Sequence, residues 1–295
     1  MKLVTFDHGG TTRVGVADGE EVVDLSAAAP DLPTEMIAFL EAGEAALEAA
    51  RTAVAAGGCR LALADVTLAS PILRPPKILA IGVNYRDHIE EAREGGMKVP
   101  EFPVLFNKQS TSAHPPFAPI HLPRASSALD YEGELGVVIG KPCRHVPRER
   151  AHEVVAGYTI VDDATVRDWQ LRTPTFTIGK SFDTHCPMGP WIVTADEFGD
   201  PHTHDIKTWV NGELRQDSNT KHLVFDCFDL IEHLSTAFTL EVGDVIPTGT
   251  PGGVGIAMKP PQLLKVGDVV KIAIDGIGEI EHGVIAEPAD TARIG

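Results

Sequence analysis

Residues 129–140 read Leu129-Asp130-Tyr131-Glu132-Gly133-Glu134-Leu135-Gly136-Val137-Val138-Ile139-Gly140, and this stretch predicts a β-strand that carries two acidic side chains. Successive side chains of a strand alternate between its two faces. One face is apolar and holds Tyr131, Leu135, Val137 and Ile139. Glu132 and Glu134 share the other face, where two carboxylates repel each other unless a cation lies between them. Oxygen ligands of this kind suit Mg²⁺, Mn²⁺ or Ca²⁺. A strand edge with two solvated glutamates is the alternative explanation.

A third acidic candidate follows the next apolar stretch. Val154, Val155, Tyr158 and Ile160 lead directly into Asp162 and Asp163. One aspartate beside Glu132 and Glu134 would complete a three-carboxylate cation site, with water or substrate in the other ligand positions. The alternative is an aspartate that caps a short helix over residues 165–171. Asp162 and Asp163 can fill different roles, so both explanations stay open.

Composition narrows the class of protein. The chain has 295 residues, of which 43% are hydrophobic, and a formal net charge of −17. No run of Lys or Arg occurs, which argues against binding to nucleic acid or to an anionic membrane, because phosphate contacts need clustered cations. The four cysteines are scattered and form no Cys-x-x-Cys pair, so a reducing compartment is expected. The N-terminal residues lack the apolar stretch of a signal peptide. We therefore expect a cytoplasmic protein without membrane spans.

The chain divides into two predicted domains. Residues 1–70 predict a small α+β domain with strands at 3–6, 13–17 and 21–24 and a helical pattern over 34–56 that ends at Gly57. A proline-rich linker over 71–76 opens the larger domain, residues 71–295. There, Asn211-Gly212 and Asp275-Gly276 predict tight hairpins, and 225–240 predicts a helix. The fold class is therefore α+β and mostly β.

Three further features are candidates for chemistry. His88 and Glu91 would share a helix face, where a carboxylate can orient an imidazole that activates water; an exposed histidine in a charged helix is the commoner explanation of this spacing. Lys180 follows Phe176 and Ile178, so its ammonium can point into an enclosed site. The glycine-rich residues 248–255 would let backbone amides approach an anionic ligand, although a plain connecting loop has the same composition.

Four motifs, taken together, resemble the fumarylacetoacetate hydrolase family, and the resemblance runs from about Ile78 to Val284. The motifs occur in the family's order: Asp130-Tyr131-Glu132-Gly133-Glu134-Leu135, then Asp163 to Gln170, then Gly179-Lys180-Ser181-Phe182-Asp183, then Thr248-Gly249-Thr250-Pro251. The chain looks most similar to domain-type members that act on acylpyruvates or oxaloacetate. The resemblance implies the family's β-roll, a homodimer, and a small-molecule 2-oxo acid substrate.

The resemblance also assigns expected roles. Glu132, Glu134 and Asp163 match metal ligands for Mg²⁺ or Mn²⁺, and His88 with Glu91 matches a catalytic dyad. Positions that hold the substrate and its developing charge are matched by Lys180, Arg167, Gln170, Gly249 and Thr250. Many members have a longer residue, often Arg, where this chain has Val83, which puts a substrate carboxylate contact there in doubt.

The expected activity is metal-dependent hydrolysis of a C–C bond in acylpyruvate-type diketo acids. A metal-stabilised pyruvate enolate would leave after His88, oriented by Glu91, activates water and Lys180 holds the developing charge. Decarboxylation of oxaloacetate passes through the same enolate, and isomerisation of an unsaturated 2-oxo dicarboxylate needs only proton transfer, so both are alternatives. A binding protein with a structural cation would need no general base.

Overall fold

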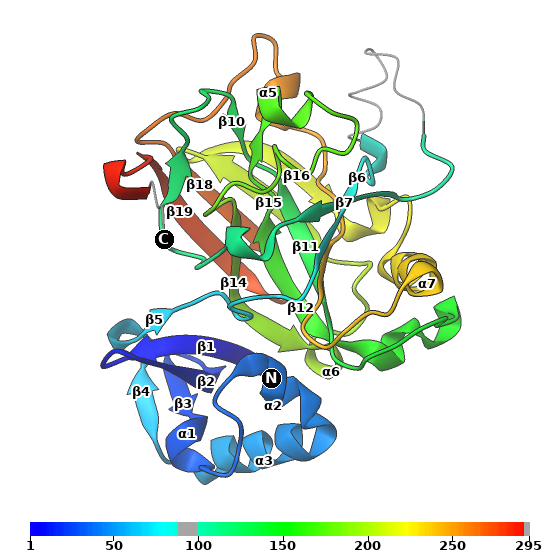
Figure 1. The fold of residues 1–295 in the computed structure, drawn as a ribbon. Helices are drawn as coiled ribbons and strands as arrows, with labels where there is room; N and C mark the ends of the chain where they lie inside the picture. Colours follow the sequence, from blue (N-terminus) through cyan, green and yellow to red (C-terminus); the bar gives the residue numbers. More distant parts are fainter. Residues whose placement is uncertain (88–98, 292–295) are drawn as a thin grey trace.

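A computed structural model describes residues 1–87 and 99–291. Its centre is a mostly antiparallel sheet against which a second, smaller sheet packs (Figure 1). The larger sheet has twelve strands, and its main path runs β4-β3-β2-β1-β14-β12-β11-β17-β6-β7. Its strands are β1 (Lys2–His8), β2 (Thr11–Asp18), β3 (Glu21–Asp24), β4 (Arg60–Ala62), β5 (Thr67–Leu68), β6 (Ile78–Gly82), β7 (Val104–Lys108), β8 (Ala113–His114), β11 (Gly133–Ile139), β12 (Val155–Asp162), β14 (Cys186–Thr194) and β17 (Val245–Pro247).

The smaller sheet has five strands in the order β16-β15-β18-β19-β9. These are β9 (Ile120–Leu122), β15 (Asp205–Val210), β16 (Glu213–Asn219), β18 (Val269–Ile274) and β19 (Gly278–Ala286). Strands β10 (Leu129–Asp130) and β13 (Thr165–Val166) form a separate pair. The smaller sheet packs on β11, β12 and β14 of the larger one, so the middle of the molecule is buried between two sheets.

Within residues 1–87 and 99–291, helices are few and lie at the periphery. They are α1 (Leu25–Ala28), α2 (Met36–Glu41), α3 (Gly43–Ala56), α5 (Arg167–Gln170), α6 (Ala195–Phe198) and α7 (Cys227–Ala237). Short 3₁₀ turns occur at Leu63–Asp65, Ser110–Ser112, Arg148–Val154, Thr220–His222, Gly255–Ala257 and Ala289–Thr291. In the part of the chain that is described, no helix combines the length and apolar character that crossing a membrane requires. The α+β, mostly β fold class expected from the sequence is confirmed.

Local sequence signals explain most of these boundaries. Asn211 and Gly212 both have positive φ, 52° and 79°, which is the geometry of a two-residue hairpin turn between β15 and β16. Helix α7 begins at a capping box in which Asp226 and Asp229 each accept a backbone N–H of the other's segment. The single helix predicted over 34–56 is wrong in one respect: Gly43, with φ of 64°, separates α2 from α3.

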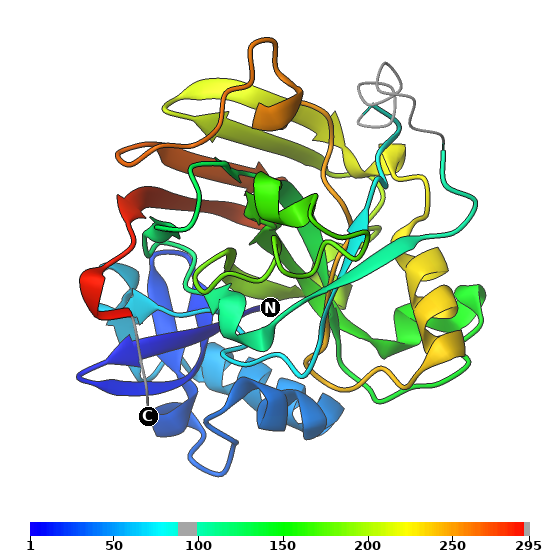
Figure 2. The same ribbon diagram turned by 45° about the horizontal axis from the view of Figure 1, so that its top comes forward.

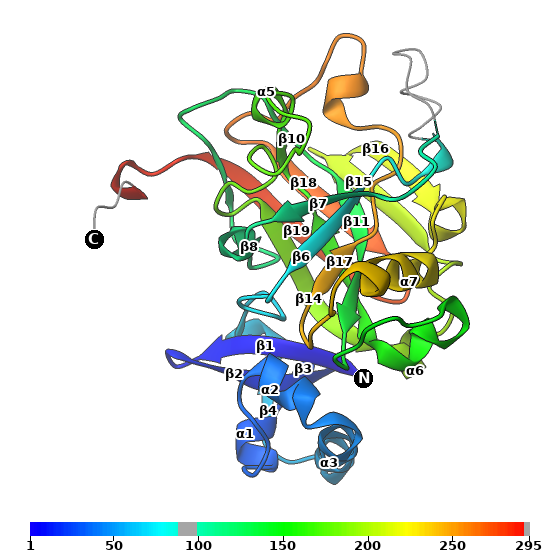
Figure 3. The same cartoon turned by 45° about the vertical axis from the view of Figure 1, so that its right-hand side comes forward.

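The first 70 residues join the larger sheet through β1, which pairs antiparallel with β14. One hydrophobic cluster contains Leu3 and Phe39 from this region together with Val138 and Ile192 from the rest of the chain. Strands β1 to β4 with α1 to α3 lie at one end of the molecule, and α5 and the Gly255–Ala257 turn lie at the other (Figure 3). A division into domains at residue 70 stays a prediction.

Strand β11 is buried on both faces. Leu135, Val137 and Ile139 belong to the cluster shared with the smaller sheet, while Val138 belongs to the cluster shared with the N-terminal helices. Glu134 is 1% exposed and Glu132 is 6% exposed. The alternative of two solvated glutamates at a strand edge is therefore wrong, and the carboxylates lie inside the protein.

Candidate metal centre and active site

Three carboxylates converge where β11 begins and β12 ends. The two strands are antiparallel, with Gly133 opposite Asp162, and the Asp163 N–H donates to the Glu132 carbonyl at 2.9 Å. This register brings Glu132, Glu134 and Asp163 to the same end of the pair. Each offers a carboxylate oxygen, and these oxygens lie within 4.8 Å of one another. The sequence prediction that the three acids lie together is therefore met by the geometry.

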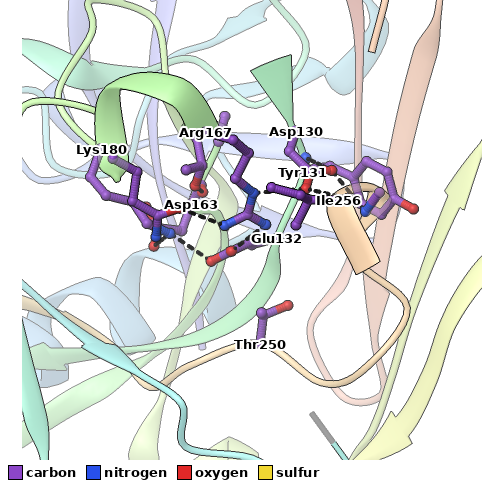
Figure 4. Close-up of polar contacts among 12 residues, drawn as sticks. Asp130, Tyr131, Glu132, Asp163, Arg167, Lys180, Thr250 and Ile256 are labelled. Atoms are coloured by element: carbon purple, nitrogen blue, oxygen red, sulfur yellow. Dashed lines mark hydrogen bonds and ion pairs between the residues drawn. The ribbon is translucent and has the colours of Figure 1, made fainter. Parts of the chain in front are cut away.

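Two lysines contact this carboxylate cluster of Glu132, Glu134 and Asp163. The Lys180 Nζ lies 2.7 Å from Glu132 Oε2 and 2.7 Å from Asp163 Oδ2. The Lys108 Nζ, from the end of β7, lies 2.6 Å from Asp163 Oδ1. Figure 4 shows Lys180 and Arg167 both directed at the Glu132 carboxylate, with Thr250 on its other side. Lys180 thus points into the enclosed site, as expected.

Arg167 links the cluster to Asp130. Its Nη2 lies 2.7 Å from Glu132 Oε1, and its Nε donates to Asp130 Oδ2 at 2.8 Å. Its Nη1 donates to the Gln170 side-chain oxygen at 3.0 Å. A buried guanidinium with three such partners is held in one orientation.

The glycine-rich loop approaches the cluster through its backbone. The Gly249 N–H donates to Glu134 Oε2 at 2.8 Å, and the Thr250 hydroxyl donates to the Gly133 carbonyl at 3.0 Å. Gly249 has φ of 104°, and a Cβ on it would lie 2.8 Å from the Asn84 Cβ, so only glycine fits there. Further along, the N–H groups of Gly255 and Ile256 donate to Asp130, so amides of this segment bind protein carboxylates. The expectation of an anionic ligand for the loop stays a prediction.

Burial and charge control ionisation in the cluster. Burial raises the pKa of the Glu134 carboxyl well above its usual range, and the charges of Asp163 and Glu132 raise it further. Burial alone would lower the pKa of the Lys180 ammonium, but Asp163 and Glu132 outweigh it, so this pKa is raised. Lys180 is therefore a cation in the described arrangement.

The donor set fits a divalent ion. Five buried carboxylates face three buried cationic side chains in and around the cluster: Asp130, Glu132, Glu134, Asp162 and Asp163 against Lys108, Arg167 and Lys180. If all five carboxylates are ionised, they exceed the three cations by two charges. Burying unpaired charge is costly, and the raised pKa of Glu134 reflects that cost. Buried carboxylate oxygens are the ligands that Mg²⁺ and Mn²⁺ prefer. A divalent cation would therefore balance both the charge and the ligand chemistry.

A cavity of about 240 Å³ opens onto the cluster. Its polar side is formed by Glu132, Glu134, Arg167, Gln170, Lys180 and Thr250, and its apolar side by Ile81, Val83, Phe106, Leu171, Phe176, Val254, Ile256 and Ala257. Val83 and Phe176 have positive φ, 57° and 61°, which is rare outside glycine. Figure 2 shows this end of the molecule, where β7, α5 and the Gly255–Ala257 turn surround the ends of β11 and β12.

A larger groove, of about 780 Å³, lies between α3 and α6. On its wall, Arg51 forms ion pairs with both Glu44 and Asp196. The smaller cavity is the stronger active-site candidate because buried charged groups converge on it.

The sequence did not identify two residues of the site, Lys108 and Asp130. Two predicted residues are not tested by the structure. Lys108 is the last residue of β7 and belongs to no catalytic motif, and Asp130 lies in a motif that assigns it no role; only the three-dimensional pairing identifies them. His88 and Glu91 lie outside the residues that the structure describes.

The chain is similar to known proteins over nearly its whole length. Residues 77–285 match the family described as fumarylacetoacetate (FAA) hydrolase C-terminal. A mitochondrial oxaloacetate tautomerase of Xenopus laevis is 43% identical over 291 residues, covering 97% of this chain and 90% of that protein. A maleylpyruvate hydrolase of Sphingobium sp. SYK-6, solved with manganese(II) and pyruvate, is 37% identical with a TM-score of 0.81, covering 98% of this chain and all (100%) of that one. A 2-hydroxyhepta-2,4-diene-1,7-dioate isomerase of Mycobacterium marinum is 32% identical with a TM-score of 0.78, covering 97% of this chain and 99% of that one.

Proposed function

The chain belongs to the fumarylacetoacetate hydrolase family, and we propose that it is a divalent-metal-dependent enzyme that acts on a 2-oxo acid through its enol or enolate form. The observation that carries this proposal is the buried cluster of Glu132, Glu134 and Asp163, which faces Lys180 across a small cavity. Such a site can hold a cation and stabilise negative charge on a ligand oxygen.

Glu132, Glu134 and Asp163 would hold Mg²⁺ or Mn²⁺. The bound ion would supply Lewis acidity to the keto and carboxylate oxygens of the substrate. Lys180 is positioned to stabilise the oxygen that becomes negative as the enolate forms. Arg167 and Gln170, which are already hydrogen-bonded to each other, would bind and orient the substrate beside it, and Thr250 would contact it from the loop.

The first candidate reaction is keto–enol tautomerisation of oxaloacetate. In it one proton leaves C3 of the keto form and one is added to the C2 oxygen, so neither water nor a C–C bond is consumed. The Xenopus laevis tautomerase, 43% identical over nearly the whole chain, favours this reaction. Sequence alone placed hydrolysis first, and the relatives change that order.

C–C hydrolysis of an acylpyruvate is the second candidate, favoured by the Sphingobium hydrolase solved with manganese and pyruvate. It would use the same enolate site and would also need His88, oriented by Glu91, to activate the attacking water. Oxaloacetate decarboxylation would share the enolate without that water. The homodimer and the cytoplasmic location expected from the sequence stay proposals.

A substrate panel tests the proposal. Oxaloacetate tautomerisation, acylpyruvate hydrolysis and pyruvate formation from oxaloacetate would be followed with Mg²⁺ or Mn²⁺ present. We expect Glu132→Gln and Lys180→Met to lower kcat/KM at least 100-fold, the order of loss when a charge-stabilising group is removed. Glu213→Gln changes an exposed glutamate and is the matched control.

Variants of His88 and Glu91 distinguish tautomerisation from hydrolysis. His88→Gln and Glu91→Gln should abolish hydrolysis and leave tautomerisation largely intact. Wild-type protein that is inert on every substrate with both metals, or Glu132→Gln with full activity, would refute the enzyme assignment.

A further inference from the structure

Three buried polar side chains lie directly beneath the carboxylate cluster and are not part of it. They are Asp162 at the end of β12, Gln216 on β16 and His282 on β19, and we call them the brace. Gln216 and His282 come from the smaller sheet, whereas Glu132 and Glu134 come from the larger one. The brace is therefore the polar connection between the smaller sheet and the cluster.

Gln216 contacts both the ligand strand and the glycine-rich loop. Its Oε1 accepts the Gly133 N–H at 3.1 Å, between the two glutamates. Its Nε2 donates to the Thr250 hydroxyl at 2.7 Å and to the Pro251 carbonyl at 2.9 Å. One fully buried amide thus sets the spacing between the glutamate backbone and the loop that carries Thr250.

Asp162 and His282 lie on the other side of Glu132. Asp162 Oδ1 accepts the Glu132 N–H at 2.9 Å. His282 Nε2 lies 3.0 Å from Asp162 Oδ2, a close polar contact without the geometry of a hydrogen bond. On β19, His282 alternates with Ile280 and Val284, which are buried and apolar. A histidine interrupts this apolar face only at the position that reaches Asp162.

The backbone between the glutamates has no space to move toward the smaller sheet. A Cβ on Gly133 would lie 2.4 Å from the Thr208 hydroxyl oxygen and 3.1 Å from the Ile272 Cγ2. Contact on this side and hydrogen bonds on both flanks leave Glu132 and Glu134 one backbone arrangement. Burying a polar group is more costly than burying an apolar one, so a purely structural role would be met more cheaply by aliphatic side chains.

We propose that Gln216, and His282 through Asp162, are positioning residues that hold the Glu132–Glu134 backbone in the geometry required to bind a divalent ion. This inference rests on the proposed function, because it requires the carboxylate cluster to be a metal site. Groups behind metal ligands typically change metal affinity or activity 10- to 100-fold when they are removed.

The test measures Mn²⁺ affinity of the folded protein by electron paramagnetic resonance, well below the unfolding temperature. Gln216→Met and His282→Phe preserve approximate volume and remove the polar contacts. We expect each to raise the Mn²⁺ dissociation constant about 10- to 100-fold. Gln216→Met should in addition raise KM, because the Thr250 hydroxyl loses the hydrogen bond from Gln216 and keeps only its bond to the Gly133 carbonyl.

Ile280→Val is the matched control on β19. It removes one buried methylene, so it should lower the unfolding temperature and leave the dissociation constant unchanged. If one brace variant does not fold, the other gives the result. A folded brace variant that binds Mn²⁺ as tightly as wild type would show that the brace does not position the metal ligands. A wild-type protein that binds no Mn²⁺ would instead overturn the proposed function itself.

Discussion

At the scale of single residues, Val83 holds a backbone conformation that β-branched residues rarely adopt. Its φ is 57°, and its neighbour Asn84 is fixed by side-chain hydrogen bonds to the carbonyls of Phe225 and Thr248. Residues forced into such conformations cluster at functional sites, where the surrounding structure determines them. Val83 lines the cavity beside the carboxylate cluster, so its strain places an apolar side chain on the cavity wall.

We expect Val83→Gly to impair the enzyme with little change in its stability. Relief of the left-handed conformation is worth about 1–2 kcal/mol, and the added freedom of glycine in the unfolded chain costs about 0.4–1 kcal/mol. Loss of the half-buried Val83 side chain offsets the remaining gain, so the free energy of unfolding should change little. The value of kcat/KM should fall because the cavity wall is lost. Urea unfolding and steady-state kinetics measure the two effects.

Cys59→Gly is the control, because Cys59 also has positive φ, 56°, and is exposed in the N-terminal region. It should gain stability with no change in activity. A Val83→Gly enzyme with wild-type kcat/KM would show that the strained conformation of Val83 is not needed for activity.

The residues of the site differ in how far the sequence could identify them. Glu132 and Glu134 follow from strand periodicity, and Asp163 from its place at a strand end, since these are local patterns. Lys108 and His282 depend on which strands become neighbours across the core, and no local pattern carries that information.

At the scale of elements, the loop from Gly249 to Ala257 is organised by one carboxylate. Asp130 accepts the N–H groups of Gly255 and Ile256 at 2.8 and 3.0 Å while it pairs with Arg167. Ile256 and Ala257 then form part of the cavity wall. Asp130 thus couples the shape of the cavity to the orientation of Arg167.

Asp130→Asn should lower the free energy of unfolding by about 3 kcal/mol, because a buried guanidinium loses a charged partner. KM should also rise, since Arg167 and the loop lose a common anchor. Asp168→Asn makes the same chemical change on the half-exposed side of α5 and should stay within about 0.5 kcal/mol of wild type. Equal destabilisation by the two variants in urea unfolding would show that Asp130 has no such role.

Elements with strong local signals were predicted well, and the exception has a local cause. The hairpin at Asn211-Gly212 and helix α7 occur where turn and capping residues specify them. The helical pattern over 34–56 predicts one continuous helix, although the chain breaks between α2 and α3, where Gly43 has positive φ. Apolar spacing continues across Gly43, so periodicity alone does not reveal the break.

At the scale of the whole molecule, two sheets bury an excess of negative charge at their junction. The fold class could be predicted from strand and turn patterns, but the packing of the smaller sheet on β11 and β12 could not, because it depends on contacts distant in sequence. That packing brings Gln216 and His282 beneath Glu132 and Glu134. The cluster is thus a product of the complete fold.

The most direct test is a titration of the metal-free protein with Mn²⁺. Calorimetry measures the binding, and thermal unfolding measures the stabilisation. We predict one ion per chain, and a gain in unfolding free energy of about 2.7 kcal/mol when free Mn²⁺ is 100 times the dissociation constant. Glu134→Gln and Asp163→Asn should lose both the binding and the stabilisation. A wild-type protein that binds no Mn²⁺, or variants that bind it as tightly as wild type, would contradict the assignment of Glu132, Glu134 and Asp163 as a metal site.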